Sequence, residues 1–185
     1  MRKILMSMVV FGLATFTSTA QEGAQLETPN STATALVAWE TDCSSIAGWH
    51  DAAETPGMNA KVDQFEPSVI RVTQEGNDTW GKVAYVVENI DLEATPVIEV
   101  KANKVEKGSA FSIAVASRDW SEMITVIKRT SADGIHEGNI RKAVKMAKKP
   151  GDWKGPISFN VVVVIEGKGK ASYFDSFKIR AEGQK

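Results

Sequence analysis

The sequence predicts an all-β domain, an antiparallel β-sandwich or barrel of about nine strands. Short segments in which apolar and polar residues alternate recur along the chain, and Gly, Pro, Asn and Asp cluster between them. No helical pattern alternates with these segments, which argues against a parallel sheet. The segment 157–165 begins with alternation and then becomes apolar on both faces, as expected of a central strand buried on both sides.

The first twenty residues have the pattern of a cleaved export signal. Arg2 and Lys3 give a basic start, residues 4–16 are mostly apolar, and Ser18-Thr19-Ala20 is a small-residue cleavage site. The apolar segment is too short for a membrane span, and none is expected. We therefore predict a signal peptide at 1–20, a flexible polar leader at 21–34 and a β-sandwich domain at 35–182. We also predict that the protein is bacterial and that it is secreted or periplasmic.

The formal net charge of −1 gives no basic excess of the kind that favours nucleic acid, so no nucleic-acid partner is expected. The single cysteine, Cys43, rules out an intramolecular disulfide. With no histidine or aspartate motif around it, Cys43 is interpreted as a small buried apolar residue rather than as a nucleophile. The fold must then be stabilised by its core or by a bound ion.

Each strand is predicted by alternation of apolar and polar residues and by the turn residues at its ends. The expected strands are 35–40, 61–65, 68–73, 79–87, 97–103, 109–117, 122–130, 157–165 and 171–180. The strand at 109–117 has large apolar residues on one face and alanines on the other, which suggests that something packs closely on the small face. The segment 135–149 fits either a short helix capped by Asn139 or an irregular strand.

Two carboxylates fall in phase with core residues. On the last expected strand, Asp175 shares a face with Tyr173, Phe177 and Ile179 under simple alternation. On the first, Glu40 alternates with apolar residues in the same way. A carboxylate that faces a core must be paired, hydrogen-bonded or bound to a metal.

Four short patterns, in this order along the chain, resemble the galactose-binding-like β-jelly-roll, the fold of many carbohydrate-binding modules of secreted bacterial enzymes. They are Glu40 on the first strand, Gly48-Trp49 in the next loop, Asp91-Leu92 in a central connection, and Phe174-Asp175-Ser176-Phe177-Lys178-Ile179 on the last strand. The resemblance covers the domain in its order of strands. It implies a jelly-roll sandwich and a polysaccharide or oligosaccharide partner.

The resemblance also implies a structural calcium ion that joins the two ends of the domain. By position, Glu40 and Asp175 would be its ligands, with backbone carbonyls of nearby loops and Asp42. Calcium takes six to eight oxygen ligands, which suits this set. The alternative is that Asp175 accepts backbone hydrogen bonds and that Glu40 is exposed.

Loop tryptophans are the candidate binding residues, because flat aromatic surfaces with polar neighbours bind sugar rings well. Trp120 is flanked by Arg118 and Asp119, and Trp153 also lies between charged residues. An arginine beside an aromatic platform suits an acidic sugar. Trp49 is the third candidate, although the resemblance to the jelly-roll family implies that a Gly-Trp pair after the first strand packs inward. The alternative for each is that it closes an end of the core.

We therefore expect a non-catalytic carbohydrate-binding domain. A small jelly-roll polysaccharide lyase or hydrolase is the second hypothesis, although the sequence offers few candidate bases or paired acids. A protein-binding surface or adhesion module is the third, and it gains if Trp120 and Trp153 lie at opposite ends of the fold. The basic residues at 141–149 are interpreted as a solvated face.

Overall fold

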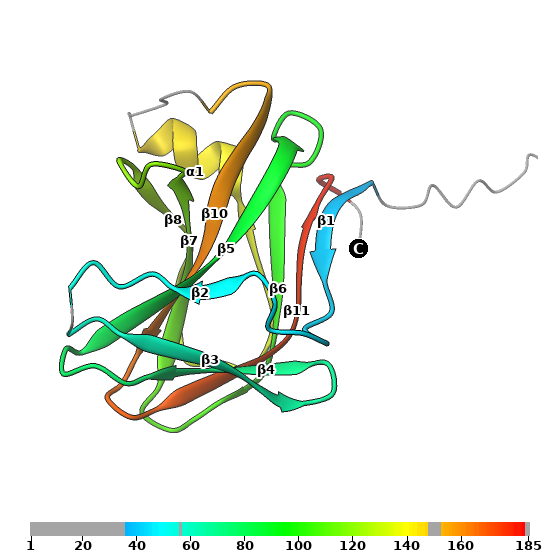
Figure 1. The fold of residues 1–185 in the computed structure, drawn as a ribbon. Coiled ribbons are helices and arrows are strands. Elements are labelled where there is room, and N and C mark those ends of the chain that lie inside the picture. The colour runs from blue at the N-terminus through cyan, green and yellow to red at the C-terminus, as the bar shows by residue number, and fades with distance from the viewer. Residues whose placement is uncertain (1–35, 56, 148–152, 184–185) are drawn as a thin grey trace, which may run out of the picture. The chain divides into compact units, whose positions relative to one another are not determined.

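The computed structural model, which describes residues 36–55, 57–147 and 153–183, confirms the all-β prediction. Two antiparallel sheets pack face to face, and each has its own strand order, so the fold is a sandwich rather than a barrel (Figure 1). The predicted signal peptide and leader lie outside the described residues. Within the described residues, no helix is long and apolar enough to cross a membrane.

Eleven strands make up the two sheets. The six-stranded sheet has the order β3 (Ala60–Glu66), β4 (Val69–Gln74), β11 (Ala171–Arg180), β6 (Val97–Val105) and β9 (Gly134–Asn139), with β1 (Val37–Thr41) also paired to β11. The five-stranded sheet has the order β2 (Trp49–Asp51), β5 (Trp80–Asp91), β10 (Pro156–Glu166), β7 (Ala110–Ser117) and β8 (Met123–Thr130).

Two of these strands differ from the sequence-based expectation. β2 lies in a segment predicted to be a loop, and it forms because its three residues pair with the edge of β5. In the ambiguous segment 135–149, both alternatives are partly correct. β9 ends at Asn139, whose side chain accepts a hydrogen bond from Lys142 N at 2.8 Å and so caps α1 (Ile140–Met146).

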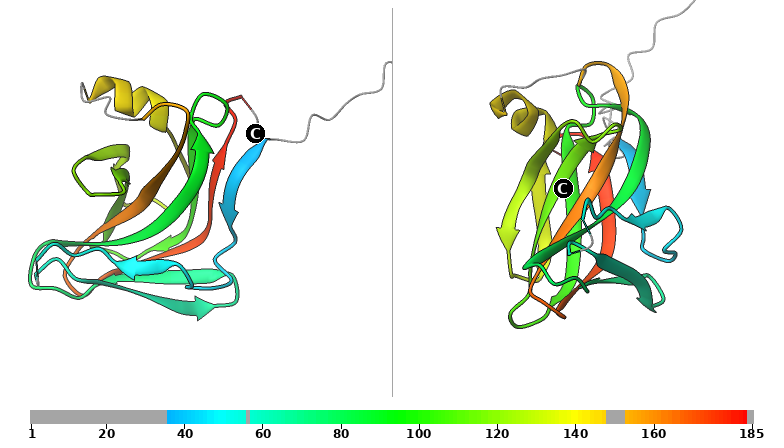
Figure 2. Two further views of the ribbon diagram at one scale, coloured as in Figure 1. Left: turned by 45° about the horizontal axis from the view of Figure 1, so that its top comes forward. Right: turned by 60° about the vertical axis from the view of Figure 1, so that its left-hand side comes forward.

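The core lies between the sheets, and β10 runs through the centre of one of them. Phe159, Val161, Val163 and Ile165 of β10 are fully buried in this core, as predicted for a central strand. α1 adds three buried side chains to the same core: Ile140, Ala143 and Val144. Figures 1 and 2 show α1 and the β3–β4 hairpin at opposite ends of the sandwich.

The predicted inward orientation of Asp175 is wrong, because a bulge interrupts β11. Phe174 pairs with Ala102 of β6 and Ser176 pairs with Lys101, which leaves Asp175 as the extra residue between them. The bulge shifts the alternation by one, so Phe174 joins Phe177 in the core and Tyr173 lies in a separate small cluster.

Glu40 was also expected to face inward, and it does not. Its neighbour Trp39 packs against the main core, with its ring centroid 5.2 Å from that of Tyr85. Alternation on β1 then turns Glu40 outward, where its side chain is 45% exposed and forms an ion pair with Lys178 at 3.0 Å.

Candidate functional site

The loop 117–122, between β7 and β8, is held in shape by its own hydrogen bonds. The Asp119 carboxylate accepts bonds from Ser117 Oγ at 2.6 Å, from Ser121 Oγ at 2.7 Å and from Ser121 N at 3.1 Å. These bonds, the one from Ser117 above all, lower the pKa of Asp119 to about 2, because they stabilise the ionised carboxylate. Asp119 is therefore an anion at neutral pH.

Further bonds tie this loop to the sheet. Ser117 Oγ accepts a bond from Glu122 N at 3.0 Å, and the buried Asn160 of β10 donates Nδ2 to Ser117 O at 2.9 Å. Trp120, near the tip, has a φ of 62°, which is uncommon for a large residue. The surrounding bonds therefore hold the loop in a conformation that Trp120 alone would not favour.

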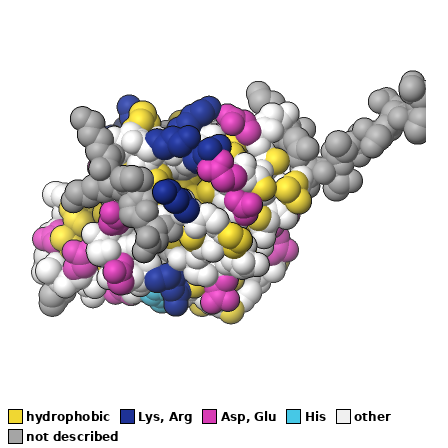
Figure 3. Space-filling view, turned by 90° about the horizontal axis from the view of Figure 1, so that it is seen from above, with side chains coloured by type: hydrophobic (Ala, Val, Ile, Leu, Met, Phe, Trp, Pro, Cys, Tyr) yellow, Lys and Arg dark blue, Asp and Glu magenta, His cyan; other side chains and the backbone are white. Residues whose placement is uncertain are grey.

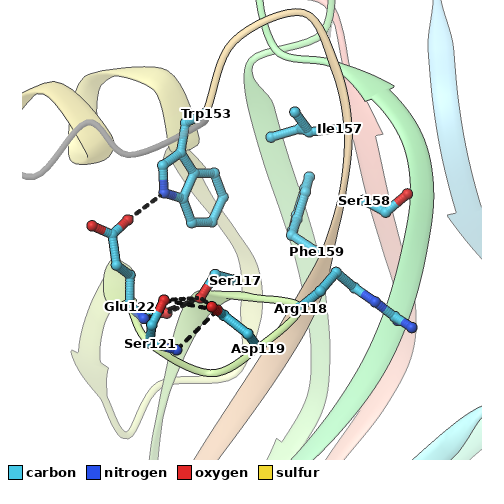
Figure 4. A pocket seen from close by; sticks show the side chains of 9 residues that line it. All are labelled: Ser117, Arg118, Asp119, Ser121, Glu122, Trp153, Ile157, Ser158 and Phe159. Carbon is cyan, nitrogen blue, oxygen red and sulfur yellow. Dashed lines mark hydrogen bonds between the residues drawn. The ribbon is translucent and has the colours of Figure 1, made fainter.

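Trp153 is held against this loop from the other side. Its Nε1 donates a hydrogen bond to Glu122 Oε2 at 2.8 Å, and its ring centroid lies 5.6 Å from that of Phe159 (Figure 4). The indole therefore has one polar contact with the loop and one apolar contact with the core. Trp153 is half-buried, which leaves part of the ring accessible.

A cavity of about 440 Å³ lies between the loop and the start of β10. Its lining combines hydroxyls, two carboxylates, a guanidinium and three apolar side chains: Ser117, Arg118, Asp119, Ser121, Glu122, Trp153, Ile157, Ser158 and Phe159 (Figure 4). This size falls within the range of small-molecule sites in proteins. Three predicted site residues, Arg118, Asp119 and Trp153, are thus brought together in one cavity.

Trp120 belongs to the same loop but does not line this cavity. It packs instead on the outward face of the five-stranded sheet, which we define by Lys82 and Ala84 of β5, Asn160, Val162 and Val164 of β10, and Ser112, Ala114 and Ala116 of β7. The predicted close packing on the alanines of β7 is confirmed, and Trp120 is one of the side chains that provides it.

This outward face holds a charged residue that the sequence analysis missed. The Lys82 side chain is 0% exposed and forms an ion pair with Glu54, whose side chain is 64% exposed. The Lys82 Nζ also lies 5.0 Å from the centroid of the Trp120 ring, a cation–π contact. The available signal was that Lys82 alternates with Ala84 on a strand that is apolar on both faces.

Trp49, the third predicted binding residue, lies in the core. It is 8% exposed, and its ring contacts those of Tyr85 and Phe177 at centroid distances of 5.4 and 4.9 Å. The inward packing that the Gly-Trp pair favoured is therefore what the structure shows. Its backbone belongs to β2, an edge strand of the five-stranded sheet.

The residues expected to bind calcium fit a cation only in part. Asp175 Oδ1 is buried without a hydrogen-bond partner, and Asp42 and Asn103 line the same cavity of about 500 Å³. Against a metal, Asp175 Oδ2 lies 2.6 Å from Lys101 Nζ, and Glu40 is not among the residues that line this cavity. The carboxylate ligands on offer are thus those of Asp175 and Asp42, and the described residues contain no group of three or more His, Cys, Asp or Glu side chains that could hold a metal.

Two smaller expectations are confirmed. Cys43 is fully buried, and burial raises the pKa of its thiol to about 12, so it packs as an apolar residue. On α1, Arg141 pairs with Glu93 and Lys142 pairs with Glu182 at 2.8 Å. Figure 3 shows basic and acidic side chains next to one another on this side of the molecule, as expected of a solvated face. Lys148 and Lys149 lie outside the described residues.

No protein-family model and no curated protein sequence matches this chain. Among solved structures, PfGH50B has 13% identity to it over 74% of this chain and 22% of its own, with a TM-score of 0.48. This chain thus spans about a fifth of PfGH50B. The mannan-recognising carbohydrate-binding module TmCBM27 has 14% identity over 81% of this chain and 99% of its own, with a TM-score of 0.44.

TmCBM61, solved in complex with β-1,4-galactotriose, has 17% identity over 74% of this chain and 91% of its own, with a TM-score of 0.42. Carbohydrate-binding modules are therefore among the solved structures that this chain resembles, as the sequence resemblance predicted. At these levels of identity the likeness concerns the fold, and the ligand must be argued from the site itself.

Proposed function

We propose that this chain is an exported, non-catalytic carbohydrate-binding domain, and that a sugar binds in the cavity between the loop 117–122 and Trp153. One observation carries the proposal: a half-buried indole stands beside a polar loop already fixed by its own hydrogen bonds. The indole offers a surface for the C–H face of a sugar ring, and the loop offers hydrogen-bonding groups for its hydroxyls. A loop fixed in advance loses little conformational entropy on binding.

The polar groups of the cavity favour binding over glycoside hydrolysis. Hydrolysis needs one carboxyl group that stays protonated, and enzymes usually achieve this by raising its pKa. Here the pKa of Asp119 is lowered, and the Glu122 carboxylate is hydrogen-bonded to the Trp153 indole. The cavity lining includes no tyrosine or histidine that would serve as the base of a lyase.

The position of the two tryptophans also bears on the adhesion hypothesis. That hypothesis would be favoured if Trp120 and Trp153 lay at opposite ends of the fold. Instead, Glu122 of the loop that carries Trp120 accepts the hydrogen bond from Trp153. The two tryptophans thus meet the same loop, Trp153 from the cavity and Trp120 from the outward face of the five-stranded sheet.

A glycan-array screen followed by calorimetry tests the proposal. Trp153→Ala should weaken binding of any sugar found by about fivefold or more, since loss of an aromatic stacking surface typically costs about 1 kcal/mol or more. Trp39→Phe is the matched control, because Trp39 packs against the core and away from the cavity. Unchanged affinity in Trp153→Ala would place the sugar elsewhere, and no binding to any glycan would exclude the proposed function.

We keep a structural calcium ion as part of the proposal, now with Asp175 and Asp42 as its carboxylate ligands. The buried, unpaired Asp175 Oδ1 supports it, and the lysine beside Asp175 opposes it. Thermal melting with calcium and with a chelator decides whether Asp175 binds a calcium ion or only pairs with Lys101. A rise in Tm with calcium that Asp175→Asn abolishes would support the ion. An unchanged Tm would mean that the Asp175 carboxylate is neutralised by Lys101 and binds no calcium.

A further inference from the structure

We propose that Lys82 and Trp120 form a subsite for the carboxylate of an acidic sugar, and that Glu54 occupies the carboxylate position when no sugar is bound. The inference rests on the proposed function, and it names the class of ligand: oligosaccharides that contain uronic acid. It concerns the outward face of the five-stranded sheet and adjoins the cavity at Trp153 through the loop 117–122.

Burial of Lys82 carries a cost in free energy. An ammonium group removed from water must be compensated by an anion or by several hydrogen bonds. The side chain is 0% exposed, and the neighbours that share its face are small or apolar: Ser112, Ala84 and Val164. A lysine serving only solubility would lie at an exposed position, so its place on this face needs another reason.

The counter-ion of Lys82 comes from an exposed residue. Glu54 supplies the carboxylate from a segment that follows β2, and its own side chain remains 64% exposed. The backbone is anchored nearby, since Ala52 N donates to Lys82 O at 3.0 Å. The Glu54 carboxylate therefore reaches Lys82 from the solvent side, along the path that a carboxylate of a ligand would take.

An aromatic ring, that of Trp120, lies beside the Lys82 ammonium group. Lys82 Nζ lies over the Trp120 ring, 5.0 Å from its centroid, so a sugar that contacts the accessible edge of this ring would have the ammonium group near its C6 carboxylate. Trp120 is half-buried and therefore keeps part of its surface accessible.

A second cation, Arg118, lies two residues before Trp120 in the same loop. Arg118 is exposed and takes part in none of the ion pairs found among the described residues. Figure 4 shows it pointing away from Trp153. An aromatic ring with a buried ammonium group on one side and a free guanidinium nearby suits an anionic sugar better than a neutral one.

The test compares β-1,4-linked trimers of glucose and of glucuronate, which differ only at C6. Calorimetry is run on the wild-type chain, Glu54→Gln and Lys82→Met. Glu54→Gln removes the competing charge and leaves Lys82 an oxygen to bond, so it should bind the glucuronate trimer about tenfold more tightly. Lys82→Met should bind that trimer at least about tenfold more weakly, and both variants should leave the affinity for the glucose trimer unchanged.

Glu40→Gln is the matched control, because Glu40 pairs with Lys178 on the other sheet. It should change neither affinity. If Glu54→Gln binds both trimers equally, or only the glucose trimer, the inference is wrong while the proposed function stands. If neither trimer binds to any variant, the inference is also wrong, and the glycan screen alone decides the proposed function. Glu54→Gln decides the matter even if Lys82→Met does not fold.

Discussion

The two sheets turn very different outward faces away from the core. The outward face of the six-stranded sheet carries a network of charged side chains. Glu137, Glu99, Lys178 and Glu40 lie opposite one another in neighbouring strands, so acidic and basic side chains cross four strands in one row. Arg180 adds bonds to Glu99 at 3.0 Å and to Glu137 at 2.6 Å. Such a face satisfies its own charges.

The outward face of the five-stranded sheet, defined above by Lys82, Asn160 and their small neighbours, has the opposite character. Its alanines and valines are covered by Trp120 and Ala52, and its one buried cation is paired to an exposed glutamate. The comparison teaches that the ion pairs of the two faces differ in function. In the six-stranded sheet even the buried Arg180 is bonded to two carboxylates of the sheet itself, Glu99 and Glu137. Lys82 is instead paired with Glu54, whose side chain is 64% exposed, so a carboxylate of a ligand can take the place of Glu54.

Charge reversal should separate the two faces most clearly. Lys82→Glu places a second carboxylate beside Glu54 in a buried position, and we expect it to lower the free energy of unfolding by about 3 kcal/mol or more. Lys178→Glu makes the same change where the side chain is 33% exposed, and it should cost about 1 kcal/mol or less. Urea denaturation measures both. Equal losses of unfolding free energy in the two variants would mean that the ion pairs of the two faces contribute alike to stability.

A neutral polar residue of the same outward face should have an intermediate effect. Asn160→Ala leaves Ser117 O without the bond from Asn160 Nδ2, and we expect a loss of about 1–2 kcal/mol by urea denaturation. Ser158→Ala, two residues earlier on the same strand, is the control. It removes only a long, exposed hydrogen bond from Asn89 N, at 3.4 Å, and should change stability by less than about 0.5 kcal/mol. If both variants are neutral, the bond does not fix the loop.

The smallest effect is expected at the tip of the loop 117–122, where the charge is fully exposed. Ser121→Ala removes one of the hydroxyl bonds to Asp119, so the pKa of that carboxyl should rise from about 2 toward 3.8. A carboxyl whose pKa is lowered on folding stabilises the fold above pH 3.8, and this contribution is lost as the pH falls through about 2.

Carbon-13 chemical shifts of the carboxyl groups, followed against pH, measure this change directly. Asp42, whose pKa is also lowered but by bonds to Ser44, should titrate as in the wild type. An unchanged titration of Asp119 would show that Ser121 Oγ does not bond it in solution.

Much of the fold follows from local patterns in the sequence. Alternation and turn residues predicted nine of the eleven strands, because inward and outward residues must alternate on a strand that is buried on one face. β2 was missed because three residues carry too little pattern. Asp175 was placed on the wrong face because an extra residue at a bulge leaves no mark in the alternation.

The candidate site was predicted in part. Trp153, Arg118 and Asp119 could be chosen from the sequence, because an aromatic residue with charged neighbours in a loop is a local feature. Glu122 and Lys82 could not, since their roles depend on partners 31 and 28 residues away in the sequence. Trp120 and Trp153 look alike in the sequence, yet one lies on the outward face of the sheet and the other lines a cavity.

By itself, the sequence determined the class of fold, the central place of β10 and the loop residues open to a ligand, because each depends on neighbours along the chain. Only the tertiary structure decided that Glu40 and Asp175 face lysines, and that Lys82 is buried beneath Glu54 and Trp120. Burial and ion pairing depend on which distant strands meet and in which register, and residue periodicity carries no record of either.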